Sequence, residues 1–298
     1  MKSLLNANKH DLALVIGNGI NRYEAPANTN SWNSLLTALA RQHIDPNHQG
    51  IPNGVALTEF YDVLDLASKS RAGEKGLQQL FCDLMKDWSS LPQHTYVSNW
   101  ASINAAPVLT TNFEETLSIP VSAKRLRYGK AKFTAYYPWS TYFANKPIAD
   151  PLTSFAIWHI NGMQAYRQSV RLGLSHYMGS VERARSWLHK SGTRLFGATK
   201  IDKWAGSDSW LQVFFHKPLL FFGLGLEENE VFLRWLLIER AKYFKKFPER
   251  AKPGWFVFVG NSDEFDPGKR LFLEGVGIKP YPVPTYADIY SPDTWATK

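Results

Sequence analysis

Polar side chains follow several apolar segments of the chain, each at the point where a short strand is expected to end. The first apolar segment, residues 12–16, leads into Gly17-Asn18-Gly19 and then into a helical pattern. A glycine turn between a strand and a helix presents backbone N–H groups to an anion and lets the anion approach closely. The complete G-x-G-x-x-G spacing of a dinucleotide fingerprint is absent. The turn therefore predicts either a phosphate site or a tight turn without a ligand.

Four further segments end in the same way. The polar groups follow the expected strands 107–110, 155–160, 218–222 and 255–259, and they include Thr110, Thr111, Asn112, Glu114 and Glu115, then His159, Asn161 and Gly162, then Gly223, Gly225, Glu227 and Asn229, and finally Asn261. Taken singly, such residues are typical of helix caps, of a buried histidine or of carboxylates at a helix start. The carboxyl ends of parallel strands meet at one edge of a sheet, so we expect these groups to form one ligand site.

The elements that position these residues alternate between strands and helices. Helical patterns cover residues 32–42, with Ser31 as the expected N-cap, and residues 228–247. The alternation predicts an α/β fold with a Rossmann-like, mostly parallel sheet and helices on both faces. About ninety residues separate the first two strands, which predicts a helical insertion at about 44–105. A second, smaller insertion at about 118–151 is expected to form a hairpin, within one domain spanning 1–298.

Composition narrows the class of protein. The chain has 298 residues, of which 44% are hydrophobic, and its formal net charge of +8 favours acidic partners. No apolar run approaches the roughly 18 residues that span a bilayer, and the first residues do not form a signal peptide, so we expect a cytoplasmic protein with no membrane contact. Cys82 is the single cysteine, which excludes an internal disulfide and a cysteine-rich zinc cluster.

The motifs in their order along the chain resemble the SIR2-like domains of bacterial antiphage defence proteins. The resemblance rests on LVIGNGIN, LTTNFEETL, WHINGM followed by SVRLGLSHY, and LFFGLGLEENEVF, and it covers nearly the whole chain. It implies that NAD+ is the substrate and that no metal is needed. It places the first glycine turn on the pyrophosphate, Asn112 beside the nicotinamide ribose and the late glycine turn on the adenosine ribose. The implied NAD+-binding residues are Gly17, Asn18, Gly19, Ile20, Asn21, Arg22, Thr110, Thr111, Glu114, His176, Gly223, Gly225, Glu227, Asn229 and Asn261.

One position departs from the pattern of the SIR2-like domains. Those domains commonly carry the catalytic histidine directly before a glycine, where this chain has Asn161, and the histidine lies two residues earlier at His159. Residues two apart in a strand point to the same face, so His159 is expected to enter the same pocket, with His176 as an alternative. We therefore expect Asn112, His159 and Asn161 in the catalytic group. A chain that binds NAD+ and cleaves it poorly, or with help from a partner, fits the departure equally.

The resemblance leaves three functions open. Deacylation by sirtuins uses a zinc module with four cysteine ligands, which this chain lacks, so hydrolysis of NAD+ to nicotinamide and ADP-ribose by the effector of an abortive-infection system is the main hypothesis. The second hypothesis is a catalytically weak NAD+- or nucleotide-binding sensor or scaffold subunit. A nucleic-acid-binding protein fits the charge, but no recognition motif is present, so nucleic acid is an unlikely partner.

SIR2-like defence subunits are governed by oligomerisation or by a protein encoded nearby, such as an ATPase or a nucleotide-binding protein resembling an inosine-triphosphate pyrophosphatase. The resemblance therefore implies such a sensor, a homo-oligomer, or both. No segment of the sequence is left over for a separate sensor domain once the expected strands and helices are assigned. The candidate contact surfaces are the helical insertion and the aromatic segment 136–139, although this aromatic segment fits a buried loop anchor better.

Overall fold

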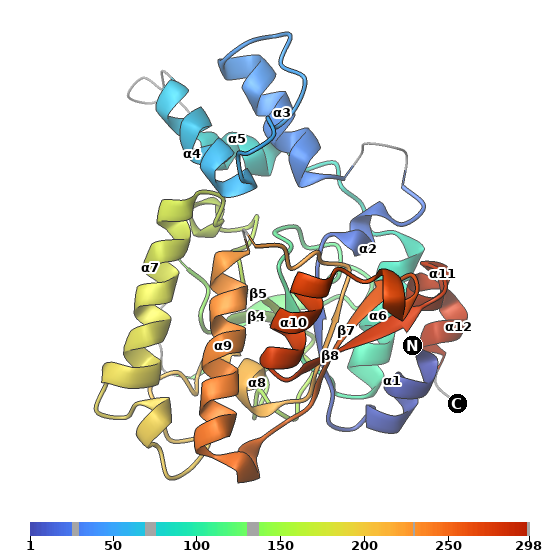
Figure 1. Ribbon diagram of the computed structural model, residues 1–298, viewed down its shortest axis with the longest axis vertical. Coiled ribbons are helices and arrows are strands. Elements are labelled where there is room, and N and C mark those ends of the chain that lie inside the picture. Colours follow the sequence, from blue (N-terminus) through green and yellow to red (C-terminus); the bar gives the residue numbers. More distant parts are fainter. Residues whose placement is uncertain (26–29, 69–75, 130–136, 229, 297–298) are drawn as a thin grey trace.

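Short strands form one mixed sheet with helices on both faces (Figure 1). The computed structural model describes residues 1–25, 30–68, 76–129, 137–228 and 230–296. Among these residues the strands are β1 (Ala13–Ile16), β2 (Val108–Thr110), β3 (Lys124–Arg127), β4 (Thr141–Ala144), β5 (Ile157–His159), β6 (Leu219–Phe222), β7 (Gly254–Val259) and β8 (Ile278–Val283). They lie in the order β3-β4-β5-β2-β1-β6-β7-β8. The six strands from β5 to β8 in this spatial order run parallel to one another, and β4 runs antiparallel to both of its neighbours. The expected α/β, mostly parallel sheet is confirmed.

Helices cover the two faces of the sheet. The helices of the described residues are α1 (Lys2–Asn8), α2 (Gly19–Arg22), α3 (Trp32–His43), α4 (Leu57–Ala67), α5 (Leu77–Leu84), α6 (Pro92–Ile103), α7 (Leu174–Arg185), α8 (Trp210–His216), α9 (Val231–Lys246), α10 (Pro267–Gly275), α11 (Ala287–Tyr290) and α12 (Pro292–Trp295). No helix among them is long and apolar enough to cross a bilayer.

Successive residues of each strand point to opposite faces, so the sheet divides the core in two. Ala13 and Val15 of β1 pack in one cluster with side chains of α7, α8, α9 and α10. Leu14 and Ile16 pack in a second cluster with side chains of α1, α6, α11 and α12. All four residues of β1 are fully buried, as expected for a central strand covered on both faces.

A third apolar cluster lies apart from the sheet. It is formed by α3, α4 and α5, which pack together through Leu39, Phe60 and Phe81 at the top of Figure 1. The predicted insertion at about 44–105 does not coincide with this cluster. The cluster includes α3, which begins before residue 44, and it excludes α6, whose Val97 and Trp100 pack on the sheet. The helices α3–α5 are tied to the segment before α7, since the Gln78 Nε2 donates to the carbonyl of Val170 at 2.8 Å.

The hairpin and the N-cap residue that the sequence predicts are both found in the structure at the expected positions. The hairpin expected in 118–151 is present as antiparallel β3 and β4, with residues 130–136 outside the described part. Ser31 precedes α3 as expected, but its side chain forms no capping hydrogen bond.

In the aromatic segment 136–139, Tyr136 lies outside the described residues. Tyr137 is buried, and the ring of Trp139 stacks on that of Trp210 with 5.6 Å between the ring centroids. The described residues of this segment therefore anchor a loop in the core, which is the second of the two interpretations that the sequence left open.

The turn after β1 packs against the turn after β6 at backbone distance. A Cβ atom placed on Gly17 would lie 2.3 Å from the Cβ of Leu224 and 2.5 Å from the carbonyl oxygen of Gly223. We expect Gly17→Ala to lower the free energy of unfolding by about 1–3 kcal/mol, because backbone must move to admit the methyl group. Urea unfolding followed by circular dichroism measures this loss.

Gly179→Ala is the matched control, because a Cβ at this position of α7 meets nothing within 4 Å. We expect the control to be neutral or to stabilise the protein by about 0.5–1 kcal/mol, as alanine is the better helix former. A Gly17→Ala variant as stable as the control would contradict the packing of the two turns.

Candidate functional site

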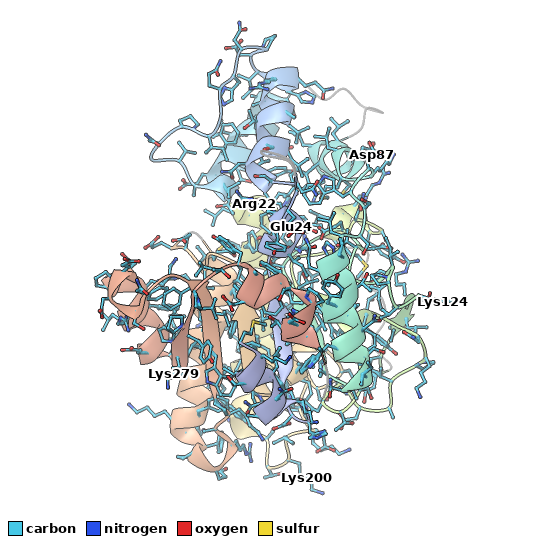
Figure 2. The ribbon with its side chains drawn as sticks, turned by 90° about the vertical axis from the view of Figure 1, so that its right-hand side faces the viewer. Arg22, Glu24, Asp87, Lys124, Lys200 and Lys279 are labelled. Carbon is cyan, nitrogen blue, oxygen red and sulfur yellow. The ribbon has the colours of Figure 1, made fainter. Side chains whose placement is uncertain are left out.

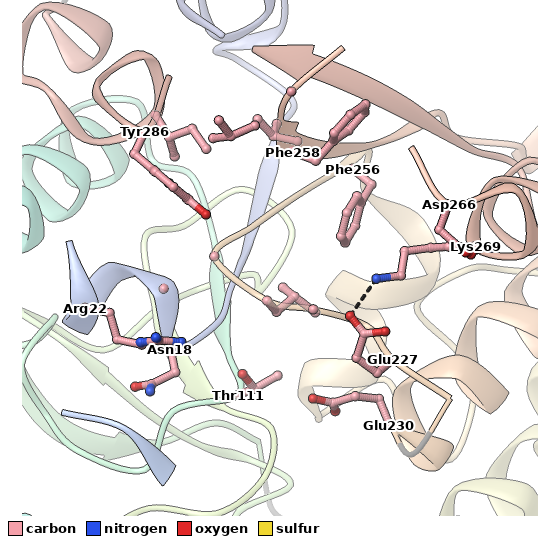
Figure 3. A pocket seen from close by; sticks show the side chains of 18 of the residues that line it. Asn18, Arg22, Thr111, Glu227, Glu230, Phe256, Phe258, Asp266, Lys269 and Tyr286 are labelled. Atoms are coloured by element: carbon pink, nitrogen blue, oxygen red, sulfur yellow. Dashed lines mark hydrogen bonds and ion pairs between the residues drawn. The ribbon is translucent and has the colours of Figure 1, made fainter. Parts of the chain in front are cut away.

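A cleft of about 720 Å³ opens at the carboxyl ends of β1, β6 and β7 (Figure 3). After β1 the chain passes to α6 on one face of the sheet, and after β6 it passes to α9 on the other face. The loops that follow two adjacent parallel strands diverge at such a point and leave a crevice, which is where open α/β sheets bind ligands. The cleft is lined by Asn18, Gly19, Arg22, Ser31, Trp32, Asn33, Leu57, Thr111, Gly223, Leu224, Gly225, Glu227, Glu230, Phe256, Val257, Phe258, Val259, Gly260, Asn261, Glu264, Phe265, Asp266, Lys269, Tyr286, Ile289 and Tyr290.

The two glycines of the first turn use their N–H groups within the fold. The N–H of Gly17 donates to the carbonyl of Phe222 at 3.0 Å, and the N–H of Gly19 donates to that of Gly223 at 2.6 Å. By contrast, the N–H groups of Leu224 and Gly225 donate to no acceptor in the described part of the chain. The second turn therefore offers two backbone donors to a ligand in the cleft, and the first turn offers the N–H of Asn18, which likewise has no acceptor among the described residues.

Charged and aromatic side chains divide the cleft into two ends. Arg22 and Asn18 lie on one side, and Lys269 lies on the other, where its Nζ contacts the Glu227 carboxylate at 2.6 Å (Figure 3). Figure 2 shows Arg22 at the junction between the α3–α5 cluster and the body that contains the sheet. The side that carries Lys269 also holds the rings of Phe256, Phe258 and Phe265. Such an arrangement fits a ligand with an anionic group near Arg22 and a flat, apolar group at the opposite end.

Glu230 also lines the cleft, and burial raises the pKa of its carboxyl to about 7, with the nearby Glu227 charge as the second cause. This carboxyl therefore exchanges its proton near neutral pH. It also borders a smaller cavity of about 40 Å³, which Trp32, Phe81 and Arg171 line beneath the α3–α5 cluster.

Asn112 and His159 form a buried pair directly behind the cleft. The Nδ1–H of His159 donates to the backbone carbonyl of Asn112 at 2.8 Å, and the Nδ2 of Asn112 donates to the carbonyl of Gly17 at 3.3 Å. The Oδ1 of Asn112 and the Nε2 of His159 have no partner among the described residues. Burial lowers the pKa of His159 to about 4, so its imidazole is neutral at pH 7 and presents a lone pair at Nε2.

A second buried network holds the side chain of Asn18 at the cleft wall. Asn21 donates from Nδ2 to Oδ1 of Asn18 and to Oε1 of Glu114, both at 2.8 Å, and its Oδ1 accepts from Nε2 of His94 at 2.9 Å. The N–H of Leu91 donates to Nδ1 of His94, which fixes the neutral tautomer. Burial raises the pKa of Glu114 to about 7, although hydrogen bonds from Asn21 and Thr116 act in the opposite direction.

The structure gathers most of the residues singled out from the sequence. Eight of them line the cleft, namely Asn18, Gly19, Arg22, Thr111, Gly223, Gly225, Glu227 and Asn261. Six more lie in the turns and networks behind that wall, namely Gly17, Ile20, Asn21, Thr110, Asn112 and Glu114. Glu114 contacts Asn21 instead of lining the cleft.

The other predicted residues lie elsewhere. Nδ1 of His176 accepts from the N–H groups of Leu172 and Gly173, both at 3.3 Å, so this histidine caps α7 and does not line the cleft. Asn161 lies in the turn after β5, where its carbonyl accepts from the N–H of Arg171 at 2.8 Å. Asn229 falls outside the described residues.

Sequence reasoning missed the wall formed by the last third of the chain. Lys269 of α10, Tyr290 of α11 and Tyr286 directly before α11 line the cleft, yet no motif marks them. The only available signal was the turn at Gly260-Asn261, which the sequence placed at the correct edge. Trp32 and Leu57 of the α3–α5 cluster were missed because the sequence does not show how that cluster lies over the sheet.

No family model matches the chain, and no curated protein matches it in sequence. The chemistry of the cleft therefore rests on its own residues, on the place of the cleft in the sheet and on the residue patterns of the sequence.

Replacing Glu114 by Gln tests the state of this buried carboxyl. The folded-state pKa of about 7 lies above the unfolded value of 4.5, so the contribution of Glu114 to stability is fully present below pH 4.5 and is lost as the pH rises through 7. Glutamine has the shape of the neutral acid and does not ionise. We expect Glu114→Gln to match the wild type at pH 5 and to be more stable by up to about 3 kcal/mol at pH 8.

Urea unfolding at both pH values measures this difference. Glu182→Gln, at an exposed position of α7, shows the effect of removing one surface carboxylate. A Glu114→Gln variant that loses stability at pH 8 relative to the wild type would show that the carboxylate is stabilised in its ionised form.

Proposed function

We propose that this chain binds NAD+ in the cleft between the turns after β1 and β6 and hydrolyses it to nicotinamide and ADP-ribose. The observation that supports the proposal best is the position of the cleft, at the divergence of two adjacent parallel strands and between two glycine turns. The residue patterns that resemble SIR2-like domains occur in the same turns. A volume of about 720 Å³ lies in the range of small-molecule sites.

The groups around the cleft suit the parts of a dinucleotide. The free N–H groups of Leu224 and Gly225 and the guanidinium of Arg22 are donors for the pyrophosphate. The rings of Phe256 and Phe258 suit the adenine. The nicotinamide ribose is then directed toward Thr111, which lines the cleft beside the buried pair of Asn112 and His159.

The reaction requires little acid–base chemistry from the protein. The nicotinamide of NAD+ is a cationic ring, so it takes the electron pair of the glycosidic bond and leaves as a neutral molecule without a general acid. Positive charge develops on the ribose, where the Oδ1 of Asn112 stabilises it through a ribose hydroxyl or orients the attacking water. Nε2 of neutral His159 accepts the hydrogen bond of that water or hydroxyl, and the proton released on attack passes to it or to solvent.

A second function, binding of NAD+ without cleavage, is favoured by one specific observation. Asn112 and His159 are buried to 0% and 1% exposure and do not themselves line the cleft. A nucleotide in the cleft therefore reaches them only after a movement of the wall near Thr111. A sensor or scaffold subunit needs the nucleotide site alone.

We also propose, from the resemblance to SIR2-like defence effectors, that activity depends on a second copy of the chain or on a partner protein. Exposed apolar side chains support an assembly. Val63 and Leu66 of α4 are 51% and 87% exposed, and Met178 on the neighbouring α7 is 55% exposed. α4 also supplies Leu57 to the wall of the cleft.

Asn112→Ala tests the proposed hydrolysis. We expect kcat for release of nicotinamide to fall by about 100-fold or more, because the amide oxygen acts only on the charge that develops during cleavage. The affinity for ADP-ribose, measured by calorimetry, is expected to stay within about threefold. Asn47→Ala, in an exposed loop, is the control. Unchanged turnover by a folded Asn112→Ala protein would contradict the assignment.

His159→Ala separates the catalytic group from the nucleotide site. We expect this variant to bind ADP-ribose and to release no nicotinamide, whereas His10→Ala, at an exposed position, behaves as the wild type. Thermal unfolding of each variant checks the fold. If wild-type protein binds NAD+ but releases no nicotinamide in any assembly state, the sensor function replaces the hydrolase.

A further inference from the structure

An ion pair closes one end of the cleft. Nζ of Lys269 lies 2.6 Å from Oε1 of Glu227, and the lysine side chain is only 16% exposed while that of Glu227 is 55% exposed (Figure 3). The two residues come from different elements, Glu227 from the loop after β6 and Lys269 from α10. The pair therefore joins two walls of the cleft at the end where the aromatic rings lie.

Both partners are held in place by their local structure. Asp266 caps α10, and its Oδ1 accepts from the backbone N–H of Lys269 at 2.6 Å, which fixes the start of the lysine side chain. The side chain of Glu227 folds back over the second glycine turn, because a Cβ on Gly225 would lie 3.0 Å from Oε1 of Glu227. The carboxylate thus lies against the turn formed by Gly223, Leu224 and Gly225, which lines the cleft.

The charges at the aromatic end of the cleft disfavour an additional anionic group on a ligand. Of the charged side chains that line the described cleft, Arg22 and Lys269 are cationic and Glu227, Glu230, Glu264 and Asp266 are carboxylates. Arg22 forms no ion pair with any described residue, so its charge is available to a ligand, while the charge of Lys269 is neutralised by Glu227. The cation available to a ligand therefore lies at the opposite side of the cleft from the aromatic end (Figure 3).

We propose that Glu227 determines which dinucleotide the cleft accepts, by holding Lys269 in an ion pair and so withholding it from a phosphate on the adenosine ribose. This inference rests on the proposed binding of NAD+, with the adenine at the aromatic end. NAD+ and NADP+ differ by one phosphate on that ribose. A phosphate placed there meets the carboxylates of Glu227 and Glu264 and no unpaired cation among the described residues that line this end, so the cleft selects the unphosphorylated nucleotide.

Glu227→Gln tests the role of the ion pair, because glutamine keeps the length of the side chain and removes its charge. We expect the Kd for NADP+, measured by calorimetry, to fall by about tenfold as Lys269 becomes free to contact the phosphate. The Kd for NAD+ of the same variant is the reference, so the expected readout is a fall of about tenfold in the ratio of the Kd for NADP+ to the Kd for NAD+. Because Glu227 is largely exposed, the variant is expected to fold, and thermal unfolding verifies this.

Two further variants identify the cause of any gain. Glu228→Gln removes the same charge from the neighbouring exposed residue, which does not line the cleft, and it is expected to leave both Kd values unchanged. Glu227→Gln combined with Lys269→Gln is expected to lose most of the gain for NADP+. A gain that persists in the double variant would show that Lys269 is not the group that binds the phosphate.

The outcomes separate this inference from the proposed function. If wild-type protein binds NAD+ and NADP+ equally, or if Glu227→Gln leaves their ratio unchanged, the role of Glu227 is overturned while the dinucleotide site stands. If wild-type protein binds neither nucleotide nor ADP-ribose, the proposed function is overturned and this inference falls with it.

Discussion

The close packing of two backbone turns is the constraint on which the site depends. β1 and β6 run side by side and parallel, and the turns that follow them touch through Gly17, Gly19 and Gly223. Gly223 has a positive φ of 70°, and a Cβ on Gly19 would lie 2.7 Å from both the Cα of Gly223 and the hydroxyl oxygen of Tyr290. Glycine is therefore required here by contact within the protein, and the cleft opens where the two chains then separate toward opposite faces of the sheet.

This packing determines which groups remain for a ligand. The N–H groups of Gly17 and Gly19 donate to the carbonyls of Phe222 and Gly223, so the backbone donors left without an acceptor among the described residues include those of Asn18, Leu224 and Gly225. The same contact places the carbonyl of Gly17 within reach of Asn112, which is how the buried pair with His159 comes to adjoin the cleft. The contact between the two turns therefore determines both the backbone donors that remain for a ligand and the position of the buried Asn112–His159 pair.

The sequence predicted the central strands and the convergence of their polar ends, because buried parallel strands form short apolar runs that turns interrupt. It did not predict β8, whose two prolines, Pro280 and Pro282, are typical of a loop and are tolerated because the strand lies at the sheet edge. The roles of Glu114 and His176 were also inaccessible, since both are set by contacts: Glu114 bonds to Asn21, ninety-three positions away, and His176 caps its own helix. Lys269 became part of the site only through the fold of α10 against the β6 turn.

A crystal structure of the protein with ADP-ribose or NAD+ tests the central claim most directly. Binding at the divergence of β1 and β6 predicts electron density for the pyrophosphate between Arg22 and the N–H groups of Leu224 and Gly225, with the adenine beside Phe256 and Phe258. The distal ribose is predicted to point toward Thr111 and Asn112. Density for the nucleotide at any other place on the protein, or an empty cleft at a nucleotide concentration that saturates binding in solution, would contradict the account.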